Sequence, residues 1–160
     1  MNDRRTFIAA IAAAGTGLLL FGRSTSNAAG MRFAVSHTPD QWQHLLGAER
    51  YHILREAGTE RPFTSPLLGE HRRGTFVCAG CGLPLFSSTT KFESGTGWPS
   101  FWRPLGGAVV TETDRSLLMV RTEVLCRRCG GHLGHVFDDG PRPTGLRYCM
   151  NGLALRFRAA

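Results

Sequence analysis

Two pairs of cysteines, each with two residues between its members, constrain the fold of this chain more than any other feature. Cys78 and Cys81 form the first pair, Cys126 and Cys129 form the second, and a glycine follows each second cysteine. Four thiolates held in two such turns are the tetrahedral donor set that suits a structural Zn²⁺, with no position left for water. The long segment between the pairs predicts that one zinc ion per chain joins two distant hairpins.

Two other uses of these cysteines stay open. In an oxidising compartment the four thiols could form two disulfides. Either pair could also be a redox-active dithiol, although that motif begins a helix within a βαβ unit, and the sequence contains no recognisable unit of that kind. The chain has five cysteines, so Cys149 is left over. It is either a small buried hydrophobe or a candidate nucleophile.

The order of predicted elements indicates one mainly β domain of the α+β type. The chain of 160 residues, 42% of them hydrophobic, suits a single modest core. Thr38 or Asp40 is predicted to cap a pair of short helices that end near Gly58. Short candidate strands follow at residues 75–78, 108–113, 118–126 and 153–157. Because the connections are mostly short, the strands are expected to pair in antiparallel fashion.

Residues 1–28 are predicted to be a signal peptide and residues 29–160 the single mature domain. Arg4 and Arg5 precede an apolar stretch over residues 7–21, and small residues close the segment before Ala28. The paired arginines resemble the twin-arginine export motif of bacteria, which predicts a periplasmic protein. An uncleaved anchor is the alternative, although the apolar stretch is shorter than the roughly 20 residues of a spanning helix.

The net charge of +7 raises the question of nucleic-acid binding. The positive residues are mostly scattered arginines, Lys91 is the only lysine, and no basic run alternates with aromatic residues. We therefore expect no nucleic-acid partner. No apolar run follows the N-terminal stretch, so no stable membrane partner is expected for the mature domain.

The residues around Cys149 favour a reactive thiol. Arg147 and Asn151 flank it, and positive charge or donated hydrogen bonds favour a thiolate. His132 and His135 are candidate proton donors or orienting groups, because four thiolates already complete the metal site. Two surface histidines near a turn are the alternative. Trp98 lies in a glycine-rich segment, where it either packs in the core or walls a pocket for an apolar methyl group.

These segments together resemble the B-type methionine sulfoxide reductases. The resemblance extends over residues 41–157 and is carried by residues 61–64, the two cysteine pairs, and residues 94–101, 121–137 and 140–151. It implies a peptide-methionine (R)-S-oxide reductase built on two small antiparallel β-sheets with a structural zinc. It also implies a set of site residues: Cys149 as nucleophile, Trp98 and Phe137 against the substrate, and His132, His135, Asp139, Arg147 and Asn151 around the sulfoxide.

The resemblance also implies a reaction. The Cys149 thiolate attacks the sulfoxide sulfur, and His132, His135 or a water that they hold protonates the departing oxygen. Methionine and a sulfenic acid on Cys149 are the products. Oxidised proteins, and free or blocked methionine sulfoxide, are the expected substrates. A zinc-stapled binding module without chemistry is the alternative function, and an inert Cys149 would favour it.

The sequence departs from the family pattern at two positions. Many members carry a second, resolving cysteine just before the Gly-Trp-Pro-Ser motif, where this chain has Thr96. No other cysteine is free for that role. We therefore expect a cycle with one cysteine, in which an external thiol, thioredoxin-like or other, regenerates the enzyme. The second departure is Gly152, where the family usually has serine after the asparagine.

Overall fold

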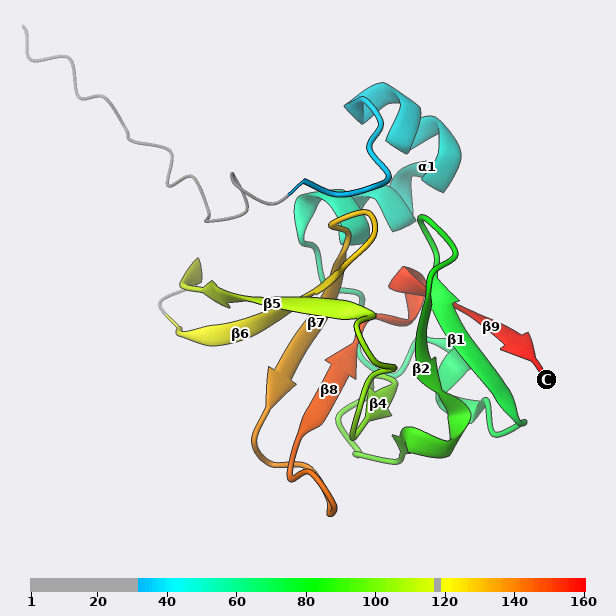
Figure 1. Ribbon diagram of the computed structural model, residues 1–160, viewed down its shortest axis with the longest axis vertical. Coiled ribbons are helices and arrows are strands. Elements are labelled where there is room, and N and C mark those ends of the chain that lie inside the picture. Colours follow the sequence, from blue (N-terminus) through cyan, green and yellow to red (C-terminus); the bar gives the residue numbers. More distant parts are fainter. Residues whose placement is uncertain (1–31, 117–118) are drawn as a thin grey trace, which may run out of the picture.

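The computed structural model describes residues 32–116 and 119–160, which fold into one α-helix and two antiparallel β-sheets (Figure 1). This architecture confirms the predicted mainly β fold. The predicted signal peptide, residues 1–28, lies outside the described residues. Among the helices that the structure describes, none combines the length and the apolar character needed to span a membrane.

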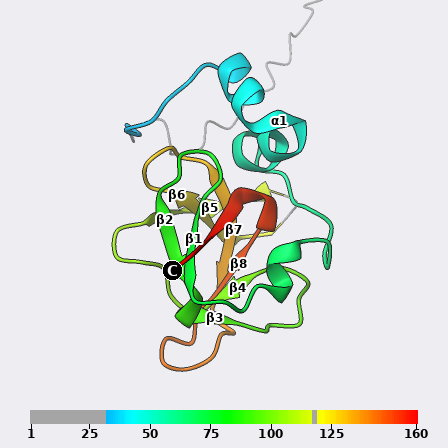
Figure 2. The same cartoon turned by 90° about the vertical axis from the view of Figure 1, so that its right-hand side faces the viewer.

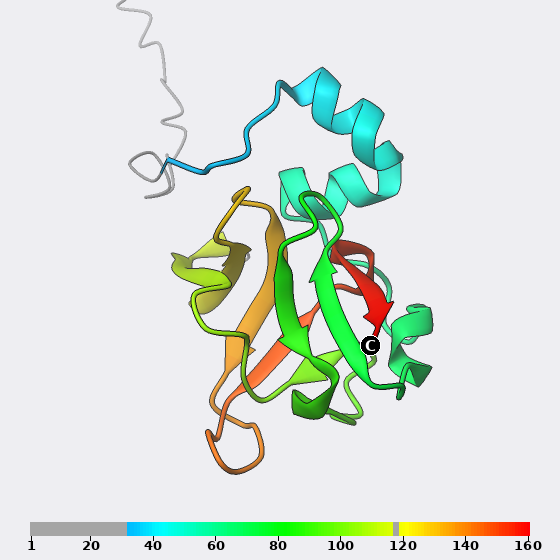
Figure 3. The same cartoon turned by 45° about the vertical axis from the view of Figure 1, so that its right-hand side comes forward.

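Helix α1 (Pro39–Glu56) is the predicted N-terminal helical stretch. Thr38 caps it as predicted, because its hydroxyl accepts a hydrogen bond from the Gln41 amide at 3.3 Å while the Gln41 side chain accepts one from the Thr38 amide at 3.0 Å. Gly47 has non-helical angles (φ 71°, ψ 166°), so the helix consists of two pieces set at an angle (Figure 3). The buried face of the helix points into the core through Trp42, Leu46, Ile53 and Leu54.

The smaller sheet has three strands in the order β2-β1-β9. Its strands are β1 (Gly74–Cys78), β2 (Pro84–Ser87) and β9 (Leu155–Ala159). Along β9, Leu155 is buried while Arg156 and Arg158 are exposed, as predicted for the terminal strand. The strand begins two residues later than predicted, because Leu153 and the buried Ala154 belong to a 3₁₀ turn. Short 3₁₀ turns connect the elements: η2 (Pro66–Gly69), η3 (Ser88–Thr90) and η5 (Gly152–Ala154).

The larger sheet has six strands in the order β3-β4-β8-β7-β6-β5. They are β3 (Lys91–Phe92), β4 (Ser100–Phe101), β5 (Val109–Asp114), β6 (Arg121–Cys126), β7 (His132–Phe137) and β8 (Arg147–Met150). Strand β6 begins at Arg121, three residues later than predicted, and Val120 before it is 71% exposed. At the other end of β6, Val124, Leu125 and Cys126 are all buried, because both faces of the strand are covered there.

Three phenylalanines join the two sheets. Phe76 of β1 lies 4.9 Å from Phe101 of β4 between ring centroids, and Phe86 of β2 stacks on the same ring at 4.3 Å. All three side chains are fully buried. Viewed from the side, the three-stranded sheet covers one face of the larger sheet (Figure 2). The aromatic cluster therefore forms the centre of a sandwich, and α1 closes one end of it.

Candidate active site and metal centre

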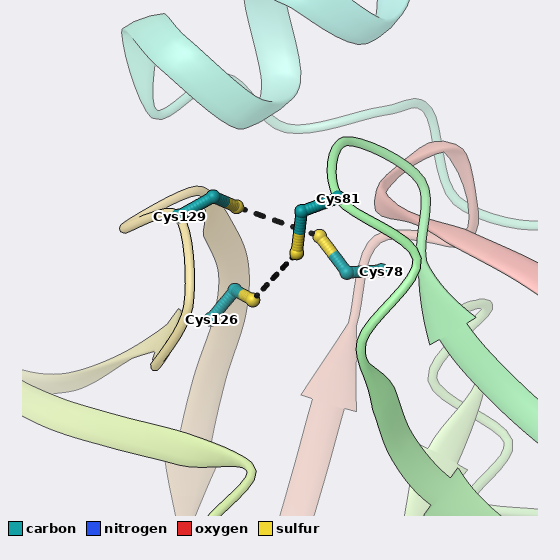
Figure 4. A group of neighbouring side chains, drawn as sticks. All are labelled: Cys78, Cys81, Cys126 and Cys129. Carbon is teal, nitrogen blue, oxygen red and sulfur yellow. Dashed lines mark hydrogen bonds between the residues drawn. The ribbon is translucent and has the colours of Figure 1, made fainter. Parts of the chain in front are cut away.

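The four predicted zinc ligands lie together between two hairpin turns (Figure 4). Cys78 and Cys81 come from the turn between β1 and β2, and Cys126 and Cys129 from the turn between β6 and β7. All four sulfurs lie within 4.8 Å of one another, with 3.7 Å from Cys78 to Cys129 and 3.5 Å from Cys81 to Cys126. Sulfurs at about 2.3 Å from a tetrahedral zinc ion are about 3.8 Å apart, so the cluster fits the metal.

The thiols of this cluster are not joined as disulfides. All five cysteines are free, and the shortest separations in the cluster are well beyond the roughly 2.05 Å of a disulfide bond. Hydrogen bonding with Cys126 lowers the pKa of Cys81 and raises the pKa of Cys78. Crowded thiols therefore share protons unequally, and a divalent cation that replaces those protons satisfies all four sulfurs at once.

Cys149 opens onto a pocket of about 120 Å³ between β7, β8 and the segment that carries Trp98. In the β7–β8 register, Cys149 lies directly opposite His135. The pocket is lined by Thr59, Trp98, Arg121, Gly134, His135, Phe137, Cys149 and Asn151. The fold thus brings together five predicted site residues that are far apart in the sequence: Trp98, His135, Phe137, Cys149 and Asn151.

His135 is held by a hydrogen bond to a carboxylate beside this pocket. Its Nε2 lies 2.9 Å from Oδ2 of Asp114, and the same carboxylate oxygen accepts a hydrogen bond from Arg121 at 2.6 Å. Burial lowers the pKa of His135, and the Asp114 hydrogen bond only partly offsets this effect. Burial also acts to raise the pKa of Asp114, but hydrogen bonds from Ser116, His135 and Arg121 outweigh it and leave that pKa lowered. The Asp114 carboxylate therefore fixes the orientation of the His135 ring beside Cys149.

His132 does not line the Cys149 pocket. It is buried, with its ring centroid 5.5 Å from that of His135, and its Nδ1 lies 2.6 Å from Oε1 of Glu123. It lines a separate hollow of about 150 Å³ that also includes Glu112. Within the described residues, Nε2 of His132 and Oε1 of Glu112 are buried without a hydrogen-bond partner. His132 can therefore reach the reaction only through the ring of His135 or through water in this hollow.

Arg147 and Asp139 form a bidentate ion pair at the rim. The Arg147 Nε and Nη2 groups each donate to Asp139 at 2.8 Å, and the guanidinium lies 4.4 Å from the centroid of the Phe137 ring. Neither predicted residue lines the pocket itself: the Asp139 carboxylate is 60% exposed, and the Arg147 side chain, 11% exposed, lies behind Phe137. The pKa of Arg147 is raised by Asp139 and also by Cys149, so its fixed positive charge acts on the Cys149 sulfur.

Glu60 connects two predicted site residues through its own backbone, a role that no sequence motif indicates. The Glu60 carbonyl accepts a hydrogen bond from the Trp98 indole at 3.2 Å, and its amide donates to the Asn151 side chain at 3.0 Å. Its carboxylate is buried and accepts hydrogen bonds from the amides of Gly152 and Leu153. Two backbone hydrogen bonds of Glu60 therefore link Trp98 and Asn151, and two to its carboxylate hold Glu60 itself in place.

Three further site residues were missed for different reasons. Asp114 and Arg121 are register partners across β5 and β6, so pairing the two predicted strands as a hairpin would have placed them together. Thr59 is an exposed residue after the helix and carries no motif of its own. Its place in the pocket depends on how the chain turns after α1.

Comparison with known proteins supports one family throughout the described domain. A SelR domain profile matches residues 46–159. A Leptospira interrogans protein named peptide methionine sulfoxide reductase MsrB is 54% identical over 129 residues, covering 80% of this chain and 98% of the relative. Proteins of the same name are 58% identical over 121 residues in Thiobacillus denitrificans, covering 75% of this chain and 92% of the relative. A protein of this name in Methanosarcina barkeri is 52% identical over 126 residues, covering 78% of this chain and 89% of the relative.

Proposed function

The chain belongs to the SelR-domain family of peptide methionine sulfoxide reductases, and we propose that it reduces the R epimer of methionine sulfoxide through a sulfenic acid on Cys149. Members of this family reduce methionine sulfoxide in oxidised proteins, and this chain is such an enzyme. The proposal concerns three further points: selectivity for the R epimer, the sulfenic acid intermediate and regeneration of Cys149 by an external thiol.

One observation carries the proposed chemistry. The single cysteine outside the four-sulfur cluster lies in a pocket that is also lined by the His135 imidazole and the Trp98 indole. A thiol, a proton-transfer group and an apolar surface for a methyl group are the three components that sulfoxide reduction by a thiol requires. A binding module without chemistry requires none of them at this spacing.

The proposed first half-reaction transfers one oxygen atom. The Cys149 thiolate attacks the sulfoxide sulfur and forms a sulfur–sulfur bond, and a proton is delivered to the oxygen. The hydroxyl group is transferred from the methionine sulfur to the Cys149 sulfur as the sulfur–oxygen and sulfur–sulfur bonds break. Methionine leaves, and Cys149 becomes a sulfenic acid, so cysteine is oxidised as the substrate is reduced. We assign the proton transfer to His135, because His135 lines the pocket and His132 does not. Arg147 places a positive charge close to Cys149.

Selection of the R epimer is assigned to the apolar and polar groups that line the pocket. Trp98 offers an apolar face for the ε-methyl group, and its indole is oriented by the Glu60 carbonyl. The pocket lining also includes the polar groups His135, Arg121 and Asn151. In this proposal the R epimer is favoured because it directs its oxygen to these polar groups while its methyl group rests on Trp98.

Regeneration by an external thiol is proposed because position 96, close to Cys149, holds a threonine and not a resolving cysteine. Its Oγ1 lies 3.7 Å from Sγ of Cys149, within reach for a resolving cysteine if one stood there. The remaining four cysteines form the metal cluster. The sulfenic acid is therefore attacked by an external thiol, which releases water and forms a mixed disulfide, and a second thiol then restores Cys149. A thioredoxin-like protein or a small thiol can serve as this reductant.

Zinc is proposed as the ion held by Cys78, Cys81, Cys126 and Cys129. The donor set is four sulfurs at a suitable separation, and the family binds zinc. When bound, the ion supplies a structural crosslink rather than a reactive centre, because four protein ligands complete its coordination. Every step of sulfoxide reduction is therefore assigned to side chains of the other pocket.

A single-turnover experiment tests the proposal. Reduced protein is incubated with racemic N-acetyl-methionine sulfoxide and no reductant, and each epimer is counted by chiral chromatography. We expect about one equivalent of the R epimer to be consumed per Cys149, with loss of one free thiol and retention of zinc. The Cys149→Ser variant should consume none.

Two results would contradict the proposal. An internal disulfide that involves Cys149 after one turnover would exclude the one-cysteine cycle. Protein with intact zinc and a free Cys149 that consumes neither epimer would favour the binding module instead.

We further propose export to the periplasm, with removal of residues 1–28. The paired arginines and the apolar stretch after them support this proposal. Replacing Arg4 and Arg5 with lysines should retain the protein in the cytoplasmic fraction with its N-terminus intact. A membrane-bound, full-length wild-type protein would favour the uncleaved anchor.

A further inference from the structure

Phe63 combines an unfavourable backbone conformation with an exposed side chain, a combination that packing of the core does not explain. Its φ of 64° is in the left-handed region, where a bulky residue is a rare and costly occupant. It follows Pro62 in a turn closed by the Thr64 hydroxyl, which donates to the Arg61 carbonyl at 2.7 Å. Glycine or asparagine is the usual residue at such a position. The phenyl ring is also 69% exposed, so burial does little to offset this strain.

The turn is fixed against the segment that forms one wall of the Cys149 pocket. The Phe63 amide donates to the Gly97 carbonyl at 2.8 Å. A side chain on Gly97 would clash, since a Cβ there would lie 2.7 Å from Cβ of Pro62 and 2.9 Å from Cδ2 of Phe63. Gly97 stands between Thr96, which contacts the Cys149 sulfur, and Trp98, which lines the pocket. The Phe63 ring is thus presented to solvent beside the pocket.

Other exposed apolar side chains in the described part of the chain lack this combination. They are Leu45, Met119 and Val120, all aliphatic. Leu45 lies within helix α1, where leucine suits the local backbone and a scattered exposed side chain needs no further explanation. Phe63 alone among the four is aromatic, has a left-handed backbone and is hydrogen-bonded to the rim of the pocket.

We propose that Phe63 is a docking residue for the polypeptide that carries the oxidised methionine. It contacts an apolar side chain close to methionine sulfoxide in the client sequence. An extended chain advances about 3.3 Å per residue, so residues next to the sulfoxide must cross the rim when the sulfoxide occupies the pocket. An exposed aromatic ring there favours clients that are locally unfolded, because such segments expose both methionine and its apolar neighbours. This inference rests on the proposed function.

The test compares two short peptides with the same central methionine (R)-sulfoxide. One has leucine on both sides of it and the other has glycine, and N-acetyl-methionine sulfoxide serves as the reference substrate. For the wild type we expect kcat/KM to be about fivefold higher for the leucine peptide, since burial of part of a phenyl ring contributes on that scale. Phe63→Gly and Phe63→Asn both accept the turn backbone and should reduce this ratio to about one.

Matched variants separate docking from folding. Phe63→Tyr keeps the ring and should keep the fivefold ratio, and Leu45→Ala removes an exposed side chain elsewhere and should keep it too. Dissociation constants of the two peptides for Cys149→Ser proteins, with and without Phe63→Gly, should give the same ratio without turnover.

An unchanged ratio in Phe63→Gly would overturn the docking role while leaving the proposed function intact. Wild-type protein that fails to reduce even the reference substrate would overturn the proposed function and, with it, this inference.

Discussion

At the scale of single residues, His135 is the proposed proton donor, and this role depends on its protonation. It faces Cys149 across the strand register and is hydrogen-bonded to Asp114 on its other side. Charged groups around it are Arg121 and His132, which both act to lower its pKa, and Asp114, which acts to raise it. Because burial is the largest effect, the pKa of His135 lies below the ordinary value of about 6.5.

Replacing Asp114 by asparagine should lower the pKa of His135 further. The change removes a negative charge that favours the imidazolium, while burial and the charge of Arg121 remain. A proton donated by His135 requires its charged form, so the decline of kcat with rising pH should move to lower pH in this variant. NMR titration of the ring nitrogens measures the pKa directly, and single-turnover rates at several pH values measure the effect on the reaction.

Asp139→Asn is the matched control for this prediction. It removes a carboxylate at the rim that is bonded to Arg147 and not to His135. If the pKa of His135 rises in Asp114→Asn, or falls equally in both variants, the assigned interaction between Asp114 and His135 is contradicted.

The residues that sequence reasoning found and those that it missed differ in what carries their function. Cys149, Trp98 and Asn151 act through their side chains, whose chemistry is visible in the sequence. Glu60 acts largely through its backbone carbonyl and amide, which every residue other than proline possesses. Only the folded structure can reveal which backbone groups meet a site.

At the scale of secondary-structure elements, the turn η5 is packed against the chain just before η2. A Cβ added to Gly152 would lie 1.9 Å from Oγ and 2.5 Å from Cβ of Ser65. Ser65 is buried, and its hydroxyl accepts a hydrogen bond from the Leu67 amide at 3.2 Å. The Ser65 hydroxyl thus occupies the space into which any side chain at position 152 would extend.

Gly152→Ser should therefore destabilise the domain by crowding Ser65. Adding Ser65→Gly to the same protein should remove this crowding. Overpacking of this kind costs about 1–3 kcal/mol, and loss of the Ser65 cap costs about 1 kcal/mol or less when glycine replaces it. Because both residues compete for one space, the double variant should be more stable than the sum of the single changes predicts, by about 1–2 kcal/mol. Urea unfolding of the four proteins measures this coupling energy. Strictly additive effects would show that the two positions do not compete.

Elements with several residues of clear periodicity were predictable, and very short ones were not. The terminal strand corresponds to β9, because alternate residues on it face the core and solvent. The predicted strand at residues 75–78 corresponds to β1, whose last three residues are all buried, so a short apolar run rather than an alternation marks it. Strands β3 and β4 have two residues each, too few for any period. Strand β8 carries Cys149, and three of its four residues are half-buried, so its pattern of burial does not alternate. Its place in the sheet is set by neighbours that are distant in sequence.

At the scale of the whole molecule, two separate features hold the sheets together. The aromatic cluster of Phe76, Phe86 and Phe101 lies between them, and the four-cysteine cluster joins their ends near α1 (Figures 1 and 4). The sequence predicted that the cysteine pairs would join two hairpins, and that arrangement is confirmed. It could not predict which sheets the hairpins belong to, since strand order depends on packing that no local pattern encodes.

Removing the metal should destabilise both sheets together while leaving the Cys149 pocket chemically intact. A ligand present at a thousandfold excess over its Kd stabilises the folded state by about 4 kcal/mol. At roughly 2–4 °C per kcal/mol for a domain of this size, chelation should lower Tm by about 10 °C. Cys81→Ser should lower Tm to a similar extent and lose zinc, whereas Cys149→Ser should keep one zinc per chain and the wild-type Tm. Differential scanning calorimetry with parallel metal analysis checks each protein. A metal-free protein with unchanged Tm would mean that the phenylalanine cluster alone holds the sheets, and zinc loss in Cys149→Ser would mean that the fifth cysteine contributes to the metal site.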